Sequence, residues 1–399
     1  MRIAMVSEHA NPLASVGRVD AGGQNVHVAA LSAHLARRGH QVTVFTRRDD
    51  AQLPDQVRTP DGYDVEHVRA GPATEIPKDD ILEHIPAFTR ALEQRWLAER
   101  FDVIHAHFWM SGLASILGAP LGVPVVQTFH ALGAVKLRHQ GARDSSPAER
   151  VAVETQLCSQ VDRVIATCSD EAAELVAMGT SRERIDIVPC GVDVEMFAER
   201  PSIPHRRRRL LSVGRLVERK GVADVIDALA RLPRDVDLLV AGGPERDALA
   251  LDPEVTRLRA VAAACGVTDR VHFLGAVPHV AMPRLFASAD VVVAVPWYEP
   301  FGIVPLEAMA CARPVVASAV GGMLDSVVPG MTGELVPPRQ PSVLSGTLDP
   351  LLANPRRRRA LGRRGRKWVT SEYRWESVAQ RTERVYESVT ADVGVALTS

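Results

Sequence analysis

Short apolar runs rich in β-branched residues alternate with longer helix-forming stretches along the whole chain, and this alternation constrains the fold more than any other feature. In the first half, the runs typical of buried strands are residues 3–7, 42–46, 102–107, 123–130, 163–168 and 185–189. The helical stretches between them include residues 24–38, 81–99 and 148–159. Strands that alternate with helices pair mainly in parallel, and the helices cover both faces of the sheet.

The second half of the chain repeats the alternation. Its predicted strands are residues 209–213, 236–241, 271–274, 289–295 and 314–317. Its predicted helices are residues 222–231, 254–265, 282–288 and 305–312. The stretch between the halves, residues 193–209, contains two prolines, ends in four arginines and has no hydrophobic period, so we expect a linker there.

The sequence therefore predicts an α/β protein with two Rossmann-like, doubly wound parallel-sheet domains, over residues 1–195 and 206–370. Sheets of this kind bind ligands at the carboxyl ends of their strands, where the strand order reverses. A ligand cleft between the two domains is the expected site, because small-molecule sites form preferentially at domain interfaces.

The charge balance and the cysteines exclude several classes of protein. Lys and Arg total 47 against 48 Asp and Glu, which argues against nucleic-acid binding because that function needs a basic surface. The five cysteines include no C-x-x-C pair, so no zinc site or disulfide framework follows, and a reducing compartment is favoured. The first residues lack the apolar run of a signal peptide, and the longest apolar region, residues 112–126, is broken by proline. A cytoplasmic location is expected.

Two clusters of basic residues leave membrane or RNA binding open. One is the run of four arginines at 206–209, and the other comprises Arg356–Arg359, Arg363, Arg364, Arg366 and Lys367. A solvated linker and the polar face of a helix explain such clusters without any partner, and we favour that interpretation. Peripheral membrane contact is the less favoured alternative.

The segment at residues 298–322 is the most informative part of the sequence. A predicted strand ends in a loop with Gly302, and Pro305 suits the first position of the helix that follows. The free amides at such a helix start form an anion site that fits a phosphate. Glu299 and Glu307 flank this site, so that one could bind sugar hydroxyls and the other a ribose. The simpler alternative makes Glu307 an acid at about the third helical position and Glu299 a loop carboxylate.

Glu299 and Glu307, with seven residues between them, resemble the E-x7-E signature of the retaining GT-B glycosyltransferases of family 4. A second segment, residues 212–221 (SVGRLVERKG), follows a predicted strand and precedes a predicted helix. In the family, an Arg and a Lys at this spacing grip the donor diphosphate, which implies that role for Arg215 and Lys220. Fixed cations stabilise the charge that a leaving nucleoside diphosphate develops.

The N-terminal half agrees with this resemblance. Gly22 and Gly23 precede a predicted helix. They do not form a G-x-G-x-x-G dinucleotide fingerprint. Without side chains, however, they allow the backbone to approach a sugar or phosphate closely. Residues 105–112 and 128–136 end two further strands of the same sheet. A lone histidine is more often structural than catalytic, but His130 matches the family-4 histidine that approaches the donor sugar.

The resemblance covers nearly the whole chain and implies the GT-B architecture. In that architecture, two Rossmann-like domains face a central cleft, and a C-terminal helix, here at about residues 373–395, packs back on the first domain. Within the family, the N-terminal motifs are most similar to the mycothiol glycosyltransferase and sucrose-phosphate synthase group, whose acceptors are phosphorylated polyols.

Five residues match acceptor-binding positions of that group. Lys78 and Arg150 stand where a Lys and an Arg hold the acceptor phosphate of the mycothiol enzyme, and Asn25 matches an acceptor-contacting Asn. Phe108 and Ala131 stand where the group has a tyrosine and a threonine, so two hydroxyls that would contact the phosphate are lost. A site that loses such donors usually binds a different ligand, which argues against inositol phosphate itself.

The resemblance implies a glycosyltransferase that moves a hexose-type sugar, with retention, from a nucleotide diphosphate donor to a hydroxyl group. The acceptor is a small polyol, sugar or natural product, with or without a phosphate, and a UDP-sugar donor is favoured over an ADP- or GDP-sugar. Glu307 is expected to hold the ribose and Glu299 the donor sugar. The expected catalytic residues are Glu299, His130, Arg215 and Lys220. The expected donor-nucleotide contacts are Gly22, Gly23, Gly214, Arg215, Lys220, Phe301, Gly302, Ile303, Val304 and Glu307.

In the family, the leaving phosphate takes the acceptor proton, so no protein nucleophile is implied. Arg and Lys supply the charge at the diphosphate, so neither a cofactor nor a catalytic metal is expected.

The alternatives are a nucleotide-sugar 2-epimerase of the same architecture, a lipid-acceptor glycosyltransferase at a membrane surface, a dinucleotide-dependent oxidoreductase and a non-enzymatic sugar-nucleotide sensor. The missing fingerprint argues against the oxidoreductase, and an epimerase would convert the donor without any acceptor.

Overall fold

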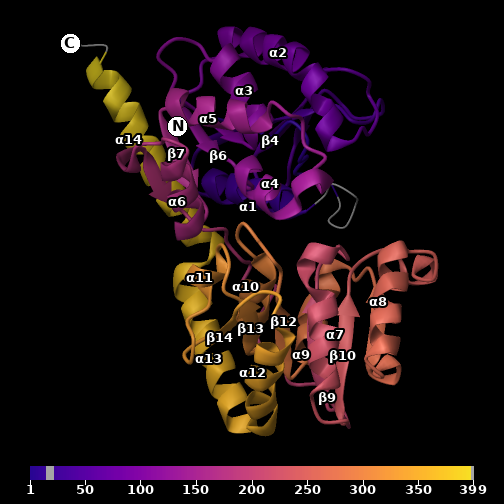
Figure 1. The fold of residues 1–399 in the computed structure, drawn as a ribbon. Coiled ribbons are helices and arrows are strands. Elements are labelled where there is room, and N and C mark those ends of the chain that lie inside the picture. The colour runs from indigo at the N-terminus through magenta and orange to yellow at the C-terminus, as the bar shows by residue number, and fades with distance from the viewer. Residues whose placement is uncertain (15–21, 397–399) are drawn as a thin grey trace. The chain divides into compact units, whose positions relative to one another are not determined.

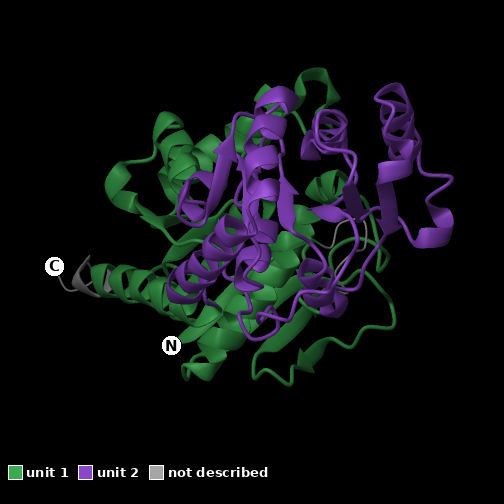
Figure 2. Ribbon diagram, turned by 90° about the horizontal axis from the view of Figure 1, so that it is seen from below, with its two compact units in different colours: residues 1–190, 375–399 green, residues 191–374 purple. Residues whose placement is uncertain are grey.

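The computed structural model describes residues 1–14 and 22–396, which fold into two compact units (Figure 1). Unit 1 comprises the described residues of 1–190 and 375–399, and unit 2 comprises residues 191–374 (Figure 2). The chain therefore leaves unit 1 once and returns to it for its last helix.

Unit 1 contains an eight-stranded sheet. Its strands are β1 (Arg2–Val6), β2 (Gln41–Arg47), β3 (Gln56–Arg58), β4 (Asp64–Val68), β5 (Val103–His107), β6 (Val125–Thr128), β7 (Arg163–Ala166) and β8 (Ile185–Ile187). They lie in the order β3-β4-β2-β1-β5-β6-β7-β8, and all neighbours are parallel except β3 and β4. The strand order reverses between β1 and β5, which is where sheets of this kind bind their ligands.

Helices cover both faces of this sheet (Figure 1). Because successive strand residues point to opposite faces, Ile3 and Met5 line one core while Ala4 and Val6 line another. The first core is covered by α1 (Gly23–Arg37) and α14 (Trp375–Ala396), which pack on each other. The second is covered by α2 (Ile85–Ala98), α3 (Trp109–Gly118) and α5 (Arg150–Gln160). The remaining helices and helical turns are η1 (Lys78–His84), α4 (Gly133–Gln140), η2 (Gly141–Arg143), α6 (Ser169–Ala177) and η3 (Arg182–Arg184).

Unit 2 contains a six-stranded sheet that is parallel throughout. Its strands are β9 (Arg208–Val213), β10 (Val236–Ala241), β11 (Val271–Gly275), β12 (Val291–Ala294), β13 (Val315–Ser318) and β14 (Gly333–Val336). They lie in the order β11-β10-β9-β12-β13-β14, so the order reverses between β9 and β12. Its helices are α7 (Val222–Ala230), α8 (Pro253–Ala264), α9 (Met282–Ala287), α10 (Ile303–Ala310), α11 (Met323–Ser326), α12 (Pro341–Ala353) and α13 (Pro355–Glu372), with helical turns η4 (Glu218–Lys220), η5 (Arg246–Ala248), η6 (Thr268–Arg270) and η7 (His279–Ala281).

The two sheets confirm the predicted fold class, an α/β protein built on two doubly wound, mainly parallel sheets. Strands β3, β4 and β14 were not predicted from the sequence. These strands carry polar residues or glycine, such as Asp64, Glu66 and Gly333, and so lack the continuous apolar run that marks a fully buried strand.

The expected linker at residues 193–209 lies inside unit 2. Phe197 is buried, with its ring 5.2 Å from that of His279 and 6.1 Å from that of Phe286, and Arg208 and Arg209 begin β9. The division between the units falls after Cys190, ahead of the expected domain end at residue 195. One buried aromatic residue in a polar, proline-containing stretch gives no periodic signal from which its packing could be predicted.

Residues of both basic clusters form ion pairs within unit 2: Arg207–Asp237, Arg208–Asp235, Arg357–Glu334 and Arg358–Asp290. Part of their charge is therefore neutralised by the fold itself. Within the described part of the chain, no helix is both long enough and apolar enough to cross a membrane.

Candidate functional site

A small pocket lies at the carboxyl ends of β9 and β10 in unit 2. Gly214 takes a φ of 146° there, and the facing Gly242 has no room for a side chain, because a Cβ would lie 1.9 Å from the Gly214 carbonyl oxygen. The close approach of these two loops brings together three predicted donor residues, Gly214, Arg215 and Lys220. The residues that line the pocket are Ser212, Val213, Gly214, Arg215, Leu216, Lys220, Val222, Val240 and Ala241.

Glu299 forms ion pairs with Lys220, which lines this pocket, and with the neighbouring residue Arg219. Its Oε2 atom lies 3.3 Å from Arg219 Nη1 and also accepts a hydrogen bond from Lys220 Nζ. Burial alone would raise the pKa of Glu299, but the charges of Lys220 and Arg219 lower it to about 2. The structure thus joins the two segments of unit 2 that resemble family 4. It adds Arg219, to which the sequence analysis gave no role although it lies inside the quoted segment 212–221.

The loop that carries Glu299 is packed against the start of α11. A Cβ on Gly321 would lie 1.8 Å from the Glu299 carbonyl oxygen, so only glycine permits this approach. The ring of Phe301 is buried, 6.3 Å from the ring of Tyr373. The predicted nucleotide contact of Phe301 is therefore limited to its backbone.

The start of α10 differs from the prediction. The helix begins at Ile303, with Gly302 as N-cap at a φ of 86°. Pro305 is thus the third helical residue and Glu307 the fifth, so the predictions that Pro305 opens the helix and that Glu307 is at about the third position are wrong. Glycine reaches this left-handed conformation without a steric penalty, and it starts the helix before the proline. The amides of Ile303 and Val304 still lie in the first turn, where an anion is favoured.

Glu307 is buried and interacts with a residue that the sequence analysis missed. Its Oε1 lies 2.9 Å from His279 Nε2. Burial raises the pKa of Glu307, and the hydrogen bond to Glu307 raises the pKa of His279. A histidine 28 positions away along the chain gives no local signal of this contact.

The pKa of Glu299 predicts a specific pH dependence. A carboxyl whose pKa falls from 4.5 to about 2 on folding stabilises the folded state above pH 4.5, and this contribution is lost as the pH falls from 4.5 through 2. We therefore expect the free energy of unfolding of the wild type to exceed that of Glu299→Gln at pH 6, and the difference to shrink steadily below pH 4.5. Urea titrations at several pH values measure this. A difference that is constant with pH would mean that Lys220 and Arg219 do not hold the carboxylate.

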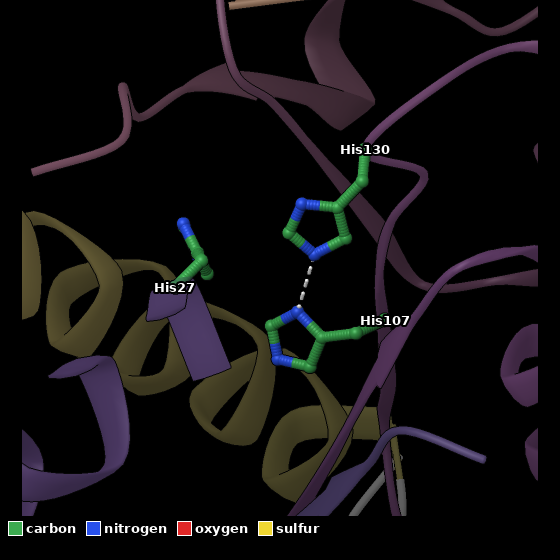
Figure 3. A group of neighbouring side chains, drawn as sticks. All are labelled: His27, His107 and His130. Atoms are coloured by element: carbon green, nitrogen blue, oxygen red, sulfur yellow. Dashed lines mark hydrogen bonds between the residues drawn. The ribbon is translucent and has the colours of Figure 1, made fainter. Parts of the chain in front are cut away.

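In unit 1, histidines gather at the carboxyl ends of β5 and β6. His107 Nδ1 lies 2.9 Å from His130 Nε2, and the ring of His27 lies 4.9 Å from that of His130 (Figure 3). Burial lowers the pKa of His27 to about 4 and of His105 to about 3, and holds those of His107 and His130 well below the ordinary value. These imidazoles are therefore neutral at pH 7 and act by donating or accepting hydrogen bonds.

Two residues at this edge have a backbone conformation that non-glycine residues rarely adopt. Phe108, directly after β5, has a φ of 81°, and His130, after β6, has a φ of 62°. Such conformations cost about 1–3 kcal/mol each and cluster at functional sites. The strain supports the prediction that this edge of the sheet carries the chemistry of unit 1.

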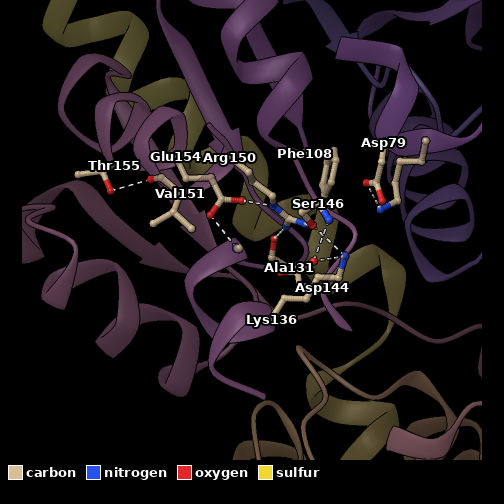
Figure 4. A network of polar contacts seen from close by, with 12 residues as sticks. Asp79, Phe108, Ala131, Lys136, Asp144, Ser146, Arg150, Val151, Glu154 and Thr155 are labelled. Carbon is tan, nitrogen blue, oxygen red and sulfur yellow. Dashed lines mark hydrogen bonds and ion pairs between the residues drawn. The ribbon is translucent and has the colours of Figure 1, made fainter. Parts of the chain in front are cut away.

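The predicted acceptor residues come together around Phe108. The guanidinium carbon of Arg150 lies 4.9 Å and Lys78 Nζ 5.7 Å from the centre of its ring. Arg150 also donates to the carbonyl oxygen of Ala131 at 2.6 Å (Figure 4). Lys78 forms an ion pair of 3.1 Å with Asp79. Four of the five predicted acceptor residues are thus brought together.

Arg150 is buried and occupied by protein partners. Its Nε donates to Glu154 Oε1 at 2.8 Å and its Nη1 to Ser146 Oγ at 3.2 Å (Figure 4). Lys136, in the quoted segment 128–136, donates to the same hydroxyl at 2.8 Å and pairs with Asp144. No role was predicted from the sequence for Lys136, Asp144, Ser146 or Glu154.

The glycine pair of the N-terminal motif lies at the start of α1. Asn25 Oδ1 accepts a hydrogen bond from the Gly22 amide at 3.0 Å, and Asn25 Nδ2 donates to the Asn11 carbonyl oxygen at 2.9 Å. Asn25 therefore fixes the entry of this helix, and its predicted acceptor contact would compete with these bonds. Gly23 is the first helical residue. Residues 15–21, which precede this pair, lie outside the described residues.

Comparison with known families places the two units in one group of enzymes. Residues 21–196 match the family described as Glycosyltransferase Family 4, and residues 193–368 match the family described as Glycosyl transferases group 1.

Whole-chain relatives agree with these matches. The chain is 35% identical to a D-inositol 3-phosphate glycosyltransferase of Kineococcus radiotolerans, covering 98% of this chain and 96% of that one. It is 36% identical to the enzyme of the same name from Xylanimonas cellulosilytica, covering 98% and 97% of the two chains. Among solved structures, sucrose-phosphate synthase from Thermosynechococcus elongatus is similar at 32% identity and a TM-score of 0.88, over 98% of this chain and 100% of that one.

Proposed function

The chain belongs to glycosyltransferase family 4 and is a glycosyltransferase with the GT-B fold, and we propose that it moves a hexose-type sugar from a UDP-sugar to a small polyol or sugar, with retention of configuration. The observation that carries this proposal is the pocket of unit 2, where Arg215 and Lys220 lie together at the carboxyl end of β9. A pocket lined by two cations at the carboxyl ends of parallel strands, one of which (β9) borders the switch point of the sheet, fits a nucleoside diphosphate.

The donor diphosphate is proposed to bind in this pocket. Arg215 and Lys220 then stabilise the negative charge that develops as the bond between the sugar C1 and the diphosphate oxygen breaks. Lys220 has to exchange Glu299 for a phosphate oxygen, and Arg219 keeps Glu299 ionised and in place after that exchange. The amides at the start of α10 add a second anion-binding group.

The two glutamates are proposed to bind hydroxyls of the donor. A carboxylate with a pKa of about 2 is ionised near neutral pH, so Glu299 is a pure hydrogen-bond acceptor for the donor sugar. Glu307 uses one oxygen for His279, and its other oxygen, to which none of the described residues donates, is the one assigned to the ribose.

No protein nucleophile is needed for this reaction. The acceptor oxygen forms its bond to C1 on the face from which the diphosphate leaves, and the acceptor proton passes to the leaving phosphate oxygen. His130, a neutral imidazole, is proposed to hydrogen-bond the donor sugar. The protein's part is then positioning and charge stabilisation, and Arg215 and Lys220 supply the charge at the leaving group without a catalytic metal.

The acceptor is proposed to bind beside Phe108 in unit 1. The names of the relatives contain a phosphorylated polyol or sugar, which supports a phosphate on the acceptor. The proposed phosphate contact is Lys78, whose side chain is 25% exposed. The side chain of Arg150 is only 2% exposed and pairs with Glu154, so Arg150 is proposed to position Phe108 instead. Without the tyrosine and threonine hydroxyls, inositol phosphate is not the proposed acceptor.

Matched acceptor pairs test this function. The full chain is incubated with UDP-glucose or UDP-N-acetylglucosamine and with fructose, fructose 6-phosphate, inositol or inositol phosphate, and UDP release is measured. We expect release that depends on an acceptor, a preference for a phosphorylated member other than inositol phosphate, and loss of that preference in Lys78→Ala. Equal rates with phosphorylated and free acceptors would contradict the phosphate contact. Donor conversion without any acceptor would contradict the transfer reaction and favour an epimerase.

A further inference from the structure

Three histidines of unit 1 form a cluster that the proposed reaction uses only in part. His27 on α1, His107 at the end of β5 and His130 after β6 each offer a ring nitrogen, and these nitrogens all lie within 4.8 Å of one another (Figure 3). His107 Nδ1 and His130 Nε2 are already 2.9 Å apart. In a tetrahedral zinc site with Zn–N bonds of about 2.1 Å, the ligand nitrogens are about 3.4 Å apart, so small rotations bring this set into range.

A fourth histidine nearby, His105, is not available as a metal ligand. His105 is fully engaged, because its Nδ1 lies 2.6 Å from Tyr386 Oη and its Nε2 2.9 Å from Thr128 Oγ1. His27 is 4% exposed, and its Nδ1 is buried without a hydrogen-bond partner among the described residues. A buried ring nitrogen without a partner is costly, and this His27 nitrogen is not committed to a hydrogen bond with any described residue.

The cluster is held on rigid elements and has one accessible side. The ring of His27 packs edge-on against Trp375 at 5.3 Å, and His107 Nε2 lies 3.3 Å from Met5 Sδ. His130 is the least buried of the three histidines, so we expect an ion and a fourth ligand to approach from its side. Ligands on a helix and at strand ends keep a constant geometry, which a metal site needs.

We propose that His27, His107 and His130 form a binding site for a divalent transition-metal ion such as Zn²⁺. Three imidazole nitrogens without a carboxylate suit Zn²⁺, Co²⁺ or Ni²⁺, whereas Mg²⁺ and Ca²⁺ prefer oxygen ligands. The bound ion fixes the His130 ring against His27 and His107, so that the ring cannot adjust to the donor sugar, and the ion thereby inhibits sugar transfer. This inhibition rests on the proposed function, whereas the metal site itself does not.

Cobalt and zinc binding to the full chain test the site directly. Protein freed of metal with a chelator is titrated with Co²⁺, the visible d–d absorption is followed, and Zn²⁺ is then used to displace it. We expect one ion per chain, no competition from Mg²⁺, and at least about 10-fold weaker binding by His27→Gln, since even the loss of an outer-shell partner costs 10- to 100-fold. The control is His34→Gln on the same helix, whose Nδ1 lies 2.8 Å from the Ala30 carbonyl oxygen and which should bind like the wild type.

The site would be overturned by the absence of saturable binding, or by equal affinities of the wild type and His27→Gln. If circular dichroism shows that His27→Gln does not fold, His130→Gln replaces it and must show the same weakening. Transfer with and without Zn²⁺ is then compared within each protein. Tight binding without inhibition would contradict the role assigned to His130 in transfer, and it would leave the metal site established.

Discussion

Replacing Lys220 with alanine should lower turnover by about 10²- to 10³-fold while the fold survives, as expected for the loss of one group that stabilises charge in the transition state. Lys220 lines the pocket assigned to the donor diphosphate and pairs with Glu299. Its side chain is 23% exposed, and in a site partly shielded from water such a charge acts on the leaving group more strongly than in solvent. Initial rates of UDP release at saturating donor measure the effect.

The matched control is Arg257→Ala, which removes a cation of unit 2 that pairs with Glu254 on α8, outside this pocket. It should leave turnover close to the wild type. The melting temperatures of both variants show whether the fold is retained. A folded Lys220→Ala protein with nearly normal turnover would mean that the diphosphate binds elsewhere. It would also contradict the roles in donor binding that are proposed for Arg215 and Glu299.

Replacing Glu154 with alanine should lower the free energy of unfolding by about 3–5 kcal/mol, the cost of leaving one member of a buried ion pair without its partner. Glu154 and Arg150 have side chains 0% and 2% exposed. Burial raises the pKa of Glu154 in spite of Arg150, so desolvation outweighs the attraction between the pair. The variant would strand the Arg150 charge and remove the acceptor of the Gly133 amide, 2.7 Å from Glu154 Oε2.

The control for this prediction is Glu174→Ala on α6. Glu174 pairs with Arg138, whose side chain is 57% exposed, so its loss should cost about 1 kcal/mol or less. Urea unfolding followed by circular dichroism measures both variants. Equal losses in the two variants would show that Arg150 is not committed to Glu154 and is free to bind an acceptor phosphate.

The fold could be predicted from the sequence because strands buried on both faces appear as continuous apolar runs. β12 illustrates this, since all four of its residues are apolar and three of them are buried. Strands with polar residues, such as β4, and single buried side chains in irregular segments, such as Phe197, give no comparable pattern. The start of α10 was predicted wrongly because Pro305 suits the first helical position, whereas the left-handed Gly302 begins the helix two residues earlier.

The residues of the candidate site could be predicted better than their partners. Arg215, Lys220 and Gly214 were identified by a motif and do line one pocket. The pairing of Lys220 with Glu299 could not be foreseen, because the two residues lie 79 positions apart and meet only when the strands align. The pair Arg150–Glu154, by contrast, has helical i, i+4 spacing and could have been predicted.

The anomeric configuration of the transfer product is the measurement that tests the central claim most directly. The full chain is incubated with an α-linked UDP-sugar and with the acceptor that releases UDP fastest, and the product is examined by proton NMR. We expect an α-linked glycoside, with a small coupling between H1 and H2, formed in equal amount to the UDP released. A β-linked product, or UDP released without any glycoside, would contradict that claim.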